Sequence, residues 1–336
     1  MENRLLLAFV LSLGVFVGWG YFLAQVQGPL PVKEPGMEDV PVDAQALPPR
    51  APGSTPSVLP QSNSVQPVTP IPIPANPFPG EEVLIQVSTG KSHFVISNRG
   101  GVLKQLELPR FKNDSGDIID LINNPDHLTP ALALRANDPE ITSILQNAHY
   151  EASTTSIVLD ESIPEGKLTL TLNHSSGIKV TRTYVFHYND FMVELDTQIS
   201  APSLAARNLQ YDVVLGPGMG GKIASQTDYI VFSGATVFVN NERIENPPED
   251  IHDTVYYKGD LKWAAFQNKY FGSALIPQQG TKAGLVLKEK DQTFVGLEFE
   301  SVQSSASAQF MFYAGTKELE ILENKGHHLV RMIDYG

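Results

Sequence analysis

The stretch FMVELDTQIS, which runs from Phe191 to Ser200, decides the fold of this chain because apolar and polar side chains alternate along it. Successive side chains of a β-strand point to opposite faces of a sheet, so this alternation is typical of a strand with one buried face. The same pattern recurs at 168–172, 209–215 and 310–312. It predicts a mainly β chain that folds as a large twisted antiparallel β-sandwich.

Two polar segments lie where such a sandwich needs tight turns. Asn98-Arg99-Gly100-Gly101 separates two apolar runs, and Asn240-Asn241 directly follows another. Asn and Gly tolerate the positive φ that a tight hairpin turn requires. Both segments are therefore predicted to be hairpin turns.

Helical signals are few. Thr316 is predicted to cap a short C-terminal helix that ends at Gly326, because its hydroxyl can accept a backbone hydrogen bond. Leu319 and Leu322 would share one face of this helix. A second short helix is predicted at 139–148.

The N-terminus carries an apolar segment, Leu5–Leu23, in which no side chain is charged. A helix of this length spans ~28 Å, close to the ~30 Å thickness of the hydrocarbon core of a bilayer. We expect residues 1–24 to form a transmembrane signal-anchor helix. A cleaved signal peptide is the alternative, but Ala24-Gln25-Val26 is a poor cleavage site. Arg4 is the basic residue nearest the helix, and it places the N-terminus in the cytoplasm and the rest outside.

Residues 25–79 differ in composition from the C-terminal three-quarters of the chain. Fifteen of the 25 prolines lie between Pro29 and Pro79. A segment of this composition buries little surface and cannot continue a helix or strand, so we expect a disordered tether. A docking ligand for a partner protein is the less favoured interpretation. The folded β domain is expected at 80–325, followed by a connection at 326–336.

Composition excludes several classes of site. Residues 81–336 carry 21 Lys and Arg against 32 Asp and Glu, a net charge of −11. This acidic balance argues against binding nucleic acid or anionic lipid headgroups. Cysteine is absent, which excludes disulfides and thiolate metal sites.

One segment comes close to a phosphate-binding motif. Gly216–Lys222 fits G-x-x-x-x-G-K, but Ile223 stands where a P-loop needs Ser or Thr for its magnesium ion. A further strand-like run, Tyr229–Phe232, comes soon after in place of a helix. We therefore expect a glycine-rich connection between two strands.

Other reactive side chains are scattered or adjacent in ways that suit solvent exposure. His327-His328 are neighbours and cannot both face one metal in regular structure, and the acidic pairs Glu249-Asp250 and Asp160-Glu161 lie in polar, turn-like stretches. We assign no catalytic, cofactor-binding or metal-binding residue and do not expect an enzyme.

Three large aromatic residues, Trp263, Tyr270 and Phe271, are expected to line the core or the wall of a cleft, because large rings dominate burial energetics.

Three regions of the chain together resemble one family. They are the start, Met1–Phe9 (MENRLLLAF); the middle, Asp260–Pro277 (DLKWAAFQNKYFGSALIP); and the end, with Phe312–Leu319 (FYAGTKEL) and Met332–Gly336 (MIDYG). The chain is similar in these regions to the YidC family, the bacterial Oxa-type membrane protein insertases. The middle region is the most specific of the three.

The resemblance implies a twisted sandwich like that of galactose mutarotase, with a short helix at its C-terminal end. It implies a role in the insertion, folding and assembly of proteins of the bacterial inner membrane, with most of the chain in the periplasm. Implied partners are nascent inner-membrane proteins, the lipid bilayer, and the Sec translocon with SecD and SecF. No cofactor is implied.

In the family, the insertion groove belongs to five further transmembrane helices, expected to begin shortly after position 336, so no groove residue is assigned here. Two alternatives remain. One is a membrane-tethered, mutarotase-like sugar epimerase, which needs a histidine and a carboxylate that converge in a cleft. The other is a carbohydrate-binding module, or more generally a sandwich groove that holds a glycan or a peptide.

Overall fold

A computed structural model of the chain describes residues 80–113, 115–122, 125, 127–220 and 232–333. The chain divides into two units, Met1–Pro70 and Ile71–Gly336, and the described residues all belong to the second. The anchor helix expected at 1–24 and the tether expected at 25–79 lie outside them. Within the described ranges, no helix is long and apolar enough to cross a membrane.

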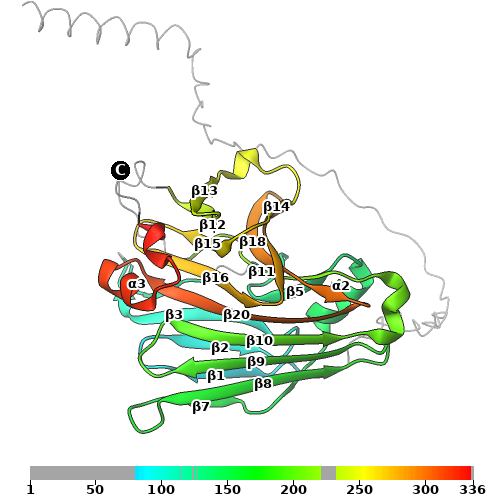
Figure 1. Ribbon diagram of the computed structural model, residues 1–336. Coiled ribbons are helices and arrows are strands. Elements are labelled where there is room, and N and C mark those ends of the chain that lie inside the picture. The colour runs from blue at the N-terminus through cyan, green and yellow to red at the C-terminus, as the bar shows by residue number, and fades with distance from the viewer. Residues whose placement is uncertain (1–79, 114, 123–124, 126, 221–231, 334–336) are drawn as a thin grey trace, which may run out of the picture. The chain divides into compact units, whose positions relative to one another are not determined.

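The largest element of the fold is a ten-stranded sheet (Figure 1). Its order is β13-β12-β15-β16-β20-β10-β9-β8-β6, and β19 pairs with β20 beside this path. The strands are β6 (Glu151–Ala152), β8 (Glu165–Asn173), β9 (Lys179–His187), β10 (Met192–Ser200), β12 (Gly234–Val239), β13 (Glu242–Asn246), β15 (Leu261–Gln267), β16 (Phe271–Gln279), β19 (Ser301–Val302) and β20 (Ser305–Thr316).

Two five-stranded sheets complete the β structure of the described residues. The first, here called the β2 sheet, has the order β4-β3-β2-β1-β7 and the second, the β18 sheet, has the order β14-β17-β18-β11-β5. Their strands are β1 (Leu84–Ser88), β2 (His93–Ser97), β3 (Val102–Lys112), β4 (Ile118–Asp120), β7 (Ser156–Val158), β5 (Ala133–Ala136), β11 (Tyr211–Leu215), β14 (Val255–Tyr257), β17 (Thr281–Glu289) and β18 (Gln292–Phe299). The prediction of a mainly β chain is confirmed.

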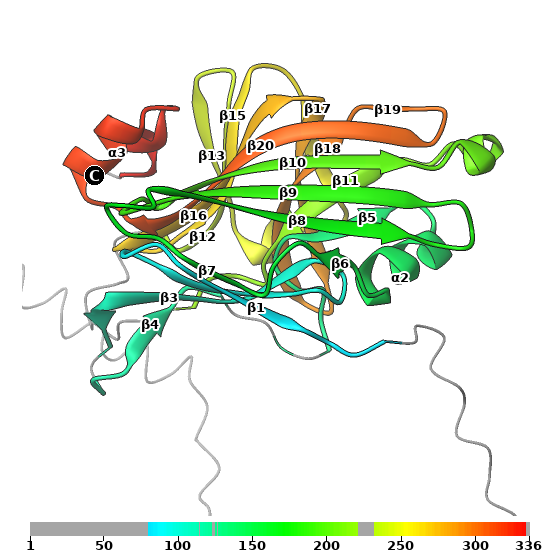
Figure 2. The ribbon, with the colours of Figure 1, turned by 90° about the horizontal axis from the view of Figure 1, so that it is seen from below.

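The predicted alternation builds the core. On β10 every second side chain from Val193 to Ile199 is buried, and the neighbouring strands β9 and β20 follow the same alternation. Aromatic pairs join the layers: Phe94 of the β2 sheet lies 5.3 Å from Phe186 of the ten-stranded sheet, ring centroid to centroid. Phe299 of the β18 sheet lies 6.1 Å from Phe310 of the ten-stranded sheet. Figure 2 shows β1 and β3 in a layer separate from β8, β9 and β10.

Both predicted hairpin turns are confirmed. Gly100 and Gly101, with φ of 72° and 62°, join β2 to β3. Asn240 and Asn241, with φ of 51° and 64°, join β12 to β13. Residues that tolerate positive φ therefore stand where the backbone requires it.

The helix predicted at 139–148 is observed as α2 (Pro139–Asn147). Asp138 caps it, because its carboxylate accepts hydrogen bonds from the backbone N–H groups of Glu140 and Ile141. Short 3-10 helices occur later in the chain at η1 (Pro202–Arg207), η3 (Pro248–Asp250) and η4 (Leu329–Met332).

The C-terminal helix is present as α3 (Leu319–Lys325) and ends at Gly326, which has φ of 68°. The predicted cap at Thr316 is wrong, because β20 continues through Thr316, which pairs with Phe271, and Glu318 is the N-cap residue. Leu319 and Leu322 are three residues apart in α3 and so lie on one face of it, as expected, but Leu322 is buried and Leu319 is 44% exposed.

The three aromatic residues separate into two groups. Trp263 and Phe271 are buried, and Trp263 stacks on Phe238 with 5.5 Å between ring centroids. The expectation is wrong for Tyr270, which is 40% exposed, with the Lys269 ammonium 5.1 Å from its ring centroid. Tyr270 lies in the turn between β15 and β16 rather than on a strand, so alternation does not direct it inward.

We predict that Trp263→Ala lowers the free energy of unfolding by about 3–5 kcal/mol, because it leaves a cavity in a packed core. Denaturant midpoints measured for the two proteins test this. Tyr270→Ala is the matched control, and it should change the free energy of unfolding by less than about 0.5 kcal/mol because the ring is exposed. Equal midpoints for Trp263→Ala and the unsubstituted chain would contradict the prediction.

Candidate functional site

The glycine-rich segment that resembles a P-loop comes directly after β11 and precedes β12. Its described half is fixed by backbone hydrogen bonds: the Gly218 N–H donates to Thr293 O at 3.4 Å, and the Gly220 N–H donates to Leu121 O at 3.1 Å. Lys222, Ile223 and all but the last residue of the strand-like run Tyr229–Phe232 lie outside the described residues.

The histidines expected to be solvated belong to the link between α3 and η4. His327 and His328 both have positive φ, and the exposed His328 ring lies 5.7 Å from Phe238, centroid to centroid. The described residues contain no group of three side chains able to hold a metal ion. The acidic pairs Glu249-Asp250 and Asp160-Glu161 are exposed, as expected.

Two histidines do meet carboxylates. His93 Nδ1 lies 3.5 Å from Glu107 Oε2 across β2 and β3, and His187 Nε2 lies 3.2 Å from Glu194 Oε1 across β9 and β10. Each histidine side chain is about one-third exposed, at 35% and 34% respectively. These contacts belong to solvated strand faces, where a general acid and base gain little from desolvation.

A group of interacting ionisable side chains lies on the β18 sheet. One such side chain from each of its five strands belongs to a group here called the ionisable row. Arg135 (β5), Asp212 (β11) and Glu298 (β18) are register partners in line, and Lys282 (β17) and Tyr256 (β14) interact with them from the next two strands. Asp212 is the register partner of both Arg135 and Glu298. The row therefore brings together residues that are far apart in sequence.

Opposite charges pair on either side of the two carboxylates. Lys282 Nζ donates a hydrogen bond to Glu298 Oε1 at 2.8 Å, and Arg135 Nε lies 3.5 Å from Asp212 Oδ1. The second contact is an ion pair without hydrogen-bond geometry, since the buried Asp212 Oδ1 accepts no hydrogen bond from any described residue. The two carboxylates stand side by side in the middle of the row.

Burial raises the pKa of Asp212 to about 6; the Arg135 guanidinium opposes this rise and the Glu298 carboxylate adds to it. Burial also raises the pKa of Tyr256, and the Glu298 and Asp212 charges act in the same direction. The row can therefore take up a proton near neutral pH. The sequence patterns above do not predict it; an Asp inside the apolar run Tyr211–Leu215 is the available signal.

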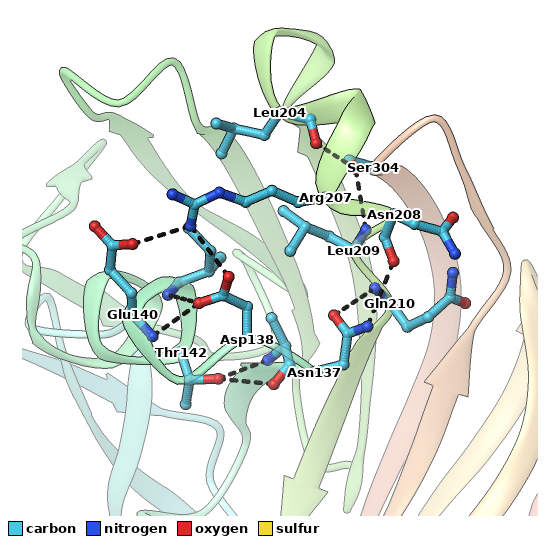
Figure 3. A network of polar contacts seen from close by, with 12 residues as sticks. Asn137, Asp138, Glu140, Thr142, Leu204, Arg207, Asn208, Leu209, Gln210 and Ser304 are labelled. Carbon is cyan, nitrogen blue, oxygen red and sulfur yellow. Dashed lines mark hydrogen bonds and ion pairs between the residues drawn. The ribbon is translucent and has the colours of Figure 1, made fainter.

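A second polar network, at one end of the sandwich, ties α2 to η1 (Figure 3). Arg207 Nη1 donates to Asp138 Oδ2 at 3.1 Å and to Glu140 Oε2 at 2.9 Å. The Asn137 N–H donates to Gln210 O at 3.1 Å, and the Gln210 N–H donates to Asn137 Oδ1 at 3.0 Å. The carboxylate that caps α2 thus also fixes the chain leading into β11.

Ser304 closes this network from the turn between β19 and β20. Its hydroxyl accepts from the Leu209 N–H at 3.0 Å and donates to Leu204 O at 2.9 Å. Tyr211 Oη donates to Ser304 O at 2.8 Å. Ser304 is 1% exposed, so these bonds satisfy groups that water cannot reach.

Comparison with known proteins decides the relationship of this chain. A family model described as the YidC periplasmic domain matches residues 84–336. The chain belongs to the YidC family. The match takes in every described strand, and therefore both the ionisable row and the network at Ser304.

Similar curated proteins carry one name. The chain is 23% identical, over its whole length and 60% of the relative, to a membrane protein insertase YidC of Pelobacter propionicus. It is 24% identical to that of Geobacter metallireducens, over 100% of the chain and 61% of the relative. The chain spans about three-fifths of the length of these relatives.

Solved structures similar to this YidC family member include a Slr1438 protein from Synechocystis, with a TM-score of 0.44, 8% identity and coverage of 71% of this chain and 97% of that one. A galactose mutarotase-like protein from Lactobacillus casei has a TM-score of 0.40, 10% identity and coverage of 69% and 99%. These values are too low to support a functional argument.

We predict that Asp212→Asn stabilises the chain above pH 6 but not below pH 4. An aspartate whose pKa rises from 3.8 to about 6 on folding binds more protons in the folded state between these values, so the free energy of unfolding falls as pH rises through this window. The penalty removed above pH 6 is about 3 kcal/mol. Urea unfolding across this pH range measures it.

Asp160→Asn is the control, and its effect on stability at neutral pH should be opposite to that of Asp212→Asn. The pKa of the exposed Asp160 is lowered, first by the Ser162 hydroxyl and then by the Ile163 and Ser162 N–H groups, so its ionised form stabilises the fold at neutral pH. This variant should lose stability at neutral pH and approach the unsubstituted chain in acid. A difference for Asp212→Asn that does not change with pH would contradict the assignment.

We predict that Ser304→Ala destabilises the chain by about 1–3 kcal/mol, because the buried Leu209 N–H loses its acceptor. Arg207→Ala is the comparison within the same network, and it should cost less than Ser304→Ala since its ion pairs are exposed. Denaturant midpoints rank the two variants. The reverse order would show that the ion pairs, and not the serine, hold this end together.

Proposed function

We propose that this chain is the N-terminal part of a membrane protein insertase and supplies its periplasmic interaction module. The observation that carries the proposal is the match to the YidC periplasmic domain over 84–336, which includes all the described strands. Whole-chain similarity to proteins named membrane protein insertase supports the same role.

The proposed arrangement has three parts. Residues 1–24 anchor the chain in the bacterial inner membrane with the N-terminus in the cytoplasm, and residues 25–79 connect the anchor to the domain. A chain of that length reaches between ~40 Å as a flexible coil and ~170 Å when fully extended. The mutarotase-like sandwich then works in the periplasm at a variable distance from the bilayer.

The C-terminal part of the domain supports a role in holding the segment beyond it. Leu329 and Met332 of η4 are fully buried, so the packed part of the domain extends beyond residue 325. Lys325 Nζ donates to Asp190 Oδ2 at 2.5 Å, and Trp263 Nε1 donates to His328 O at 3.3 Å. In our proposal, residues 326–336 form the connection toward the membrane-embedded insertion groove, and its first part is held against the domain at η4.

The proposed partners are nascent inner-membrane proteins and the Sec translocon with SecD and SecF, and a glycan or peptide could occupy a groove of the sandwich. The net charge of −11 over residues 81–336 disfavours adsorption to anionic headgroups, which supports protein contacts over lipid contacts. A sugar epimerase is less well supported, because the described histidine–carboxylate contacts lie on solvated strand faces.

Growth of cells depleted of their own insertase tests the proposal. We predict that residues 1–336 joined to a complete insertase core restore growth, whereas the 336-residue chain alone does not. The physical reason is that one transmembrane helix cannot shield a polar segment from lipid, at a cost of several kcal/mol for each unsatisfied backbone group.

Immunoblots should show equal amounts of both proteins in the membrane, so that a failure to grow reports activity and not expression. Rescue by the 336-residue chain alone would overturn the proposal and locate an insertion activity in the anchor or the sandwich.

A further inference from the structure

An arginine occupies a core position that the alternation of β9 assigns to apolar side chains. Arg182 faces inward with Val180, Tyr184 and Phe186, and it is 0% exposed. In the part of the chain that the structure describes, no carboxylate forms an ion pair with it. Arginine keeps its charge in proteins, so a full positive charge lies inside the sandwich.

The protein satisfies only part of this guanidinium. Arg182 Nη1 donates to Gly101 O at 2.7 Å, and Tyr184 Oη donates to the same oxygen at 2.9 Å. The guanidinium carbon lies 5.4 Å from the centroid of the Tyr184 ring. Nε and Nη2 are buried and have no described partner. A charge buried with so little compensation is costly.

A second buried group without a partner lies directly beside it. Thr197 on β10 is the register partner of Arg182, is 0% exposed, and its Oγ1 makes no hydrogen bond to any described residue. Cβ atoms of directly opposed strand residues are about 4.5–5.5 Å apart. The partner of Thr197 on the other side is Ala308 of β20, whose short side chain adds no polar atom.

The Gly101 carbonyl and the Tyr150 and Tyr184 hydroxyls already take part in hydrogen bonds within the protein. Gly101 O accepts two hydrogen bonds, and Tyr150 Oη donates to Leu145 O at 3.1 Å. The groups left over can all donate: the Arg182 Nε–H, the Arg182 Nη2 hydrogens and the Thr197 hydroxyl. A set of donors next to a positive charge suits a ligand that only accepts hydrogen bonds. A water molecule could bridge Arg182 and the Thr197 hydroxyl, but it would leave the positive charge without a counter-charge, which an anion supplies.

We propose that Arg182 and Thr197 form an internal site for one small monovalent anion of the size of chloride. The anion neutralises the arginine charge and accepts hydrogen bonds from both side chains. Because the site joins β9 to β10 and to the turn at Gly101, anion binding stabilises the contact between the ten-stranded sheet and the β2 sheet. The proposal does not depend on the role of the chain in insertion.

Thermal unfolding of the 336-residue chain in a non-ionic detergent tests the site, with chloride replaced stepwise by gluconate at fixed ionic strength. A ligand that binds only the folded state raises the midpoint, by about 3–5 °C for each tenfold rise in chloride above its dissociation constant. Arg182→Met should abolish this dependence, and Thr197→Val, which keeps the volume, should weaken it. Arg207→Met removes an exposed arginine as the matched control and should keep the dependence.

Crystals grown in bromide give an independent readout. We expect an anomalous peak within hydrogen-bond distance of Arg182 Nε and Nη2, and this test still decides if Arg182→Met fails to fold. A midpoint that does not respond to chloride, an equal response in Thr197→Val, or an internal water only at this position would overturn the proposal.

Discussion

The ten-stranded sheet depends on the pairing of β20 with β16 on one side and β10 on the other. β20 is the last strand in sequence but lies near the middle of the sheet, and its side chains Phe310 and Phe312 are buried. Without it, β10 and β16 would each present a long row of unpaired backbone groups. The two five-stranded sheets pack on this one continuous surface, so their positions result from the same pairing.

Within the apolar core and at its edge, single polar side chains each satisfy two partners. Ser304 satisfies two backbone groups with a single hydroxyl, and Asp138 caps a helix while holding Arg207. The ionisable row is different in kind, because its two central carboxylates are neighbours and one of them loses hydration. Burial raises the pKa of Asp212, so this carboxylate costs stability when it is ionised.

The sequence predicts strands such as β8, β9 and β10 well, because burial on one face imposes a period of two. Strands such as β15, β16 and β18 are buried at consecutive positions, so alternation does not mark them. The turns at Gly100-Gly101 and Asn240-Asn241 are equally accessible to prediction, since positive φ restricts the residue type. The prediction for Thr316 is wrong because a threonine suits both a cap and a strand end, and only pairing with Phe271 decides between them. The prediction for Tyr270 is wrong because the residue lies in a turn, one position before β16 begins at Phe271, and its ring is exposed.

The ionisable row and the Arg182–Thr197 pair lie beyond sequence reasoning for a different reason. Each depends on register between strands, such as Asp212 with Glu298 or Arg182 with Thr197, and a one-residue shift would separate the members. A single sequence shows an isolated polar residue in an apolar run. It does not show which strand will lie beside it.

The burial of η4 has a consequence for how this domain is made. Leu329 and Met332 are completely buried, so the hydrophobic interior is finished only by residues near the end of the described chain. While a ribosome is still adding these residues, β20 and η4 are not yet available. The earlier strands therefore keep apolar faces uncovered until the C-terminal residues have been made. At synthesis rates of about 5–20 residues per second, the apolar faces of these earlier strands then stay uncovered for seconds.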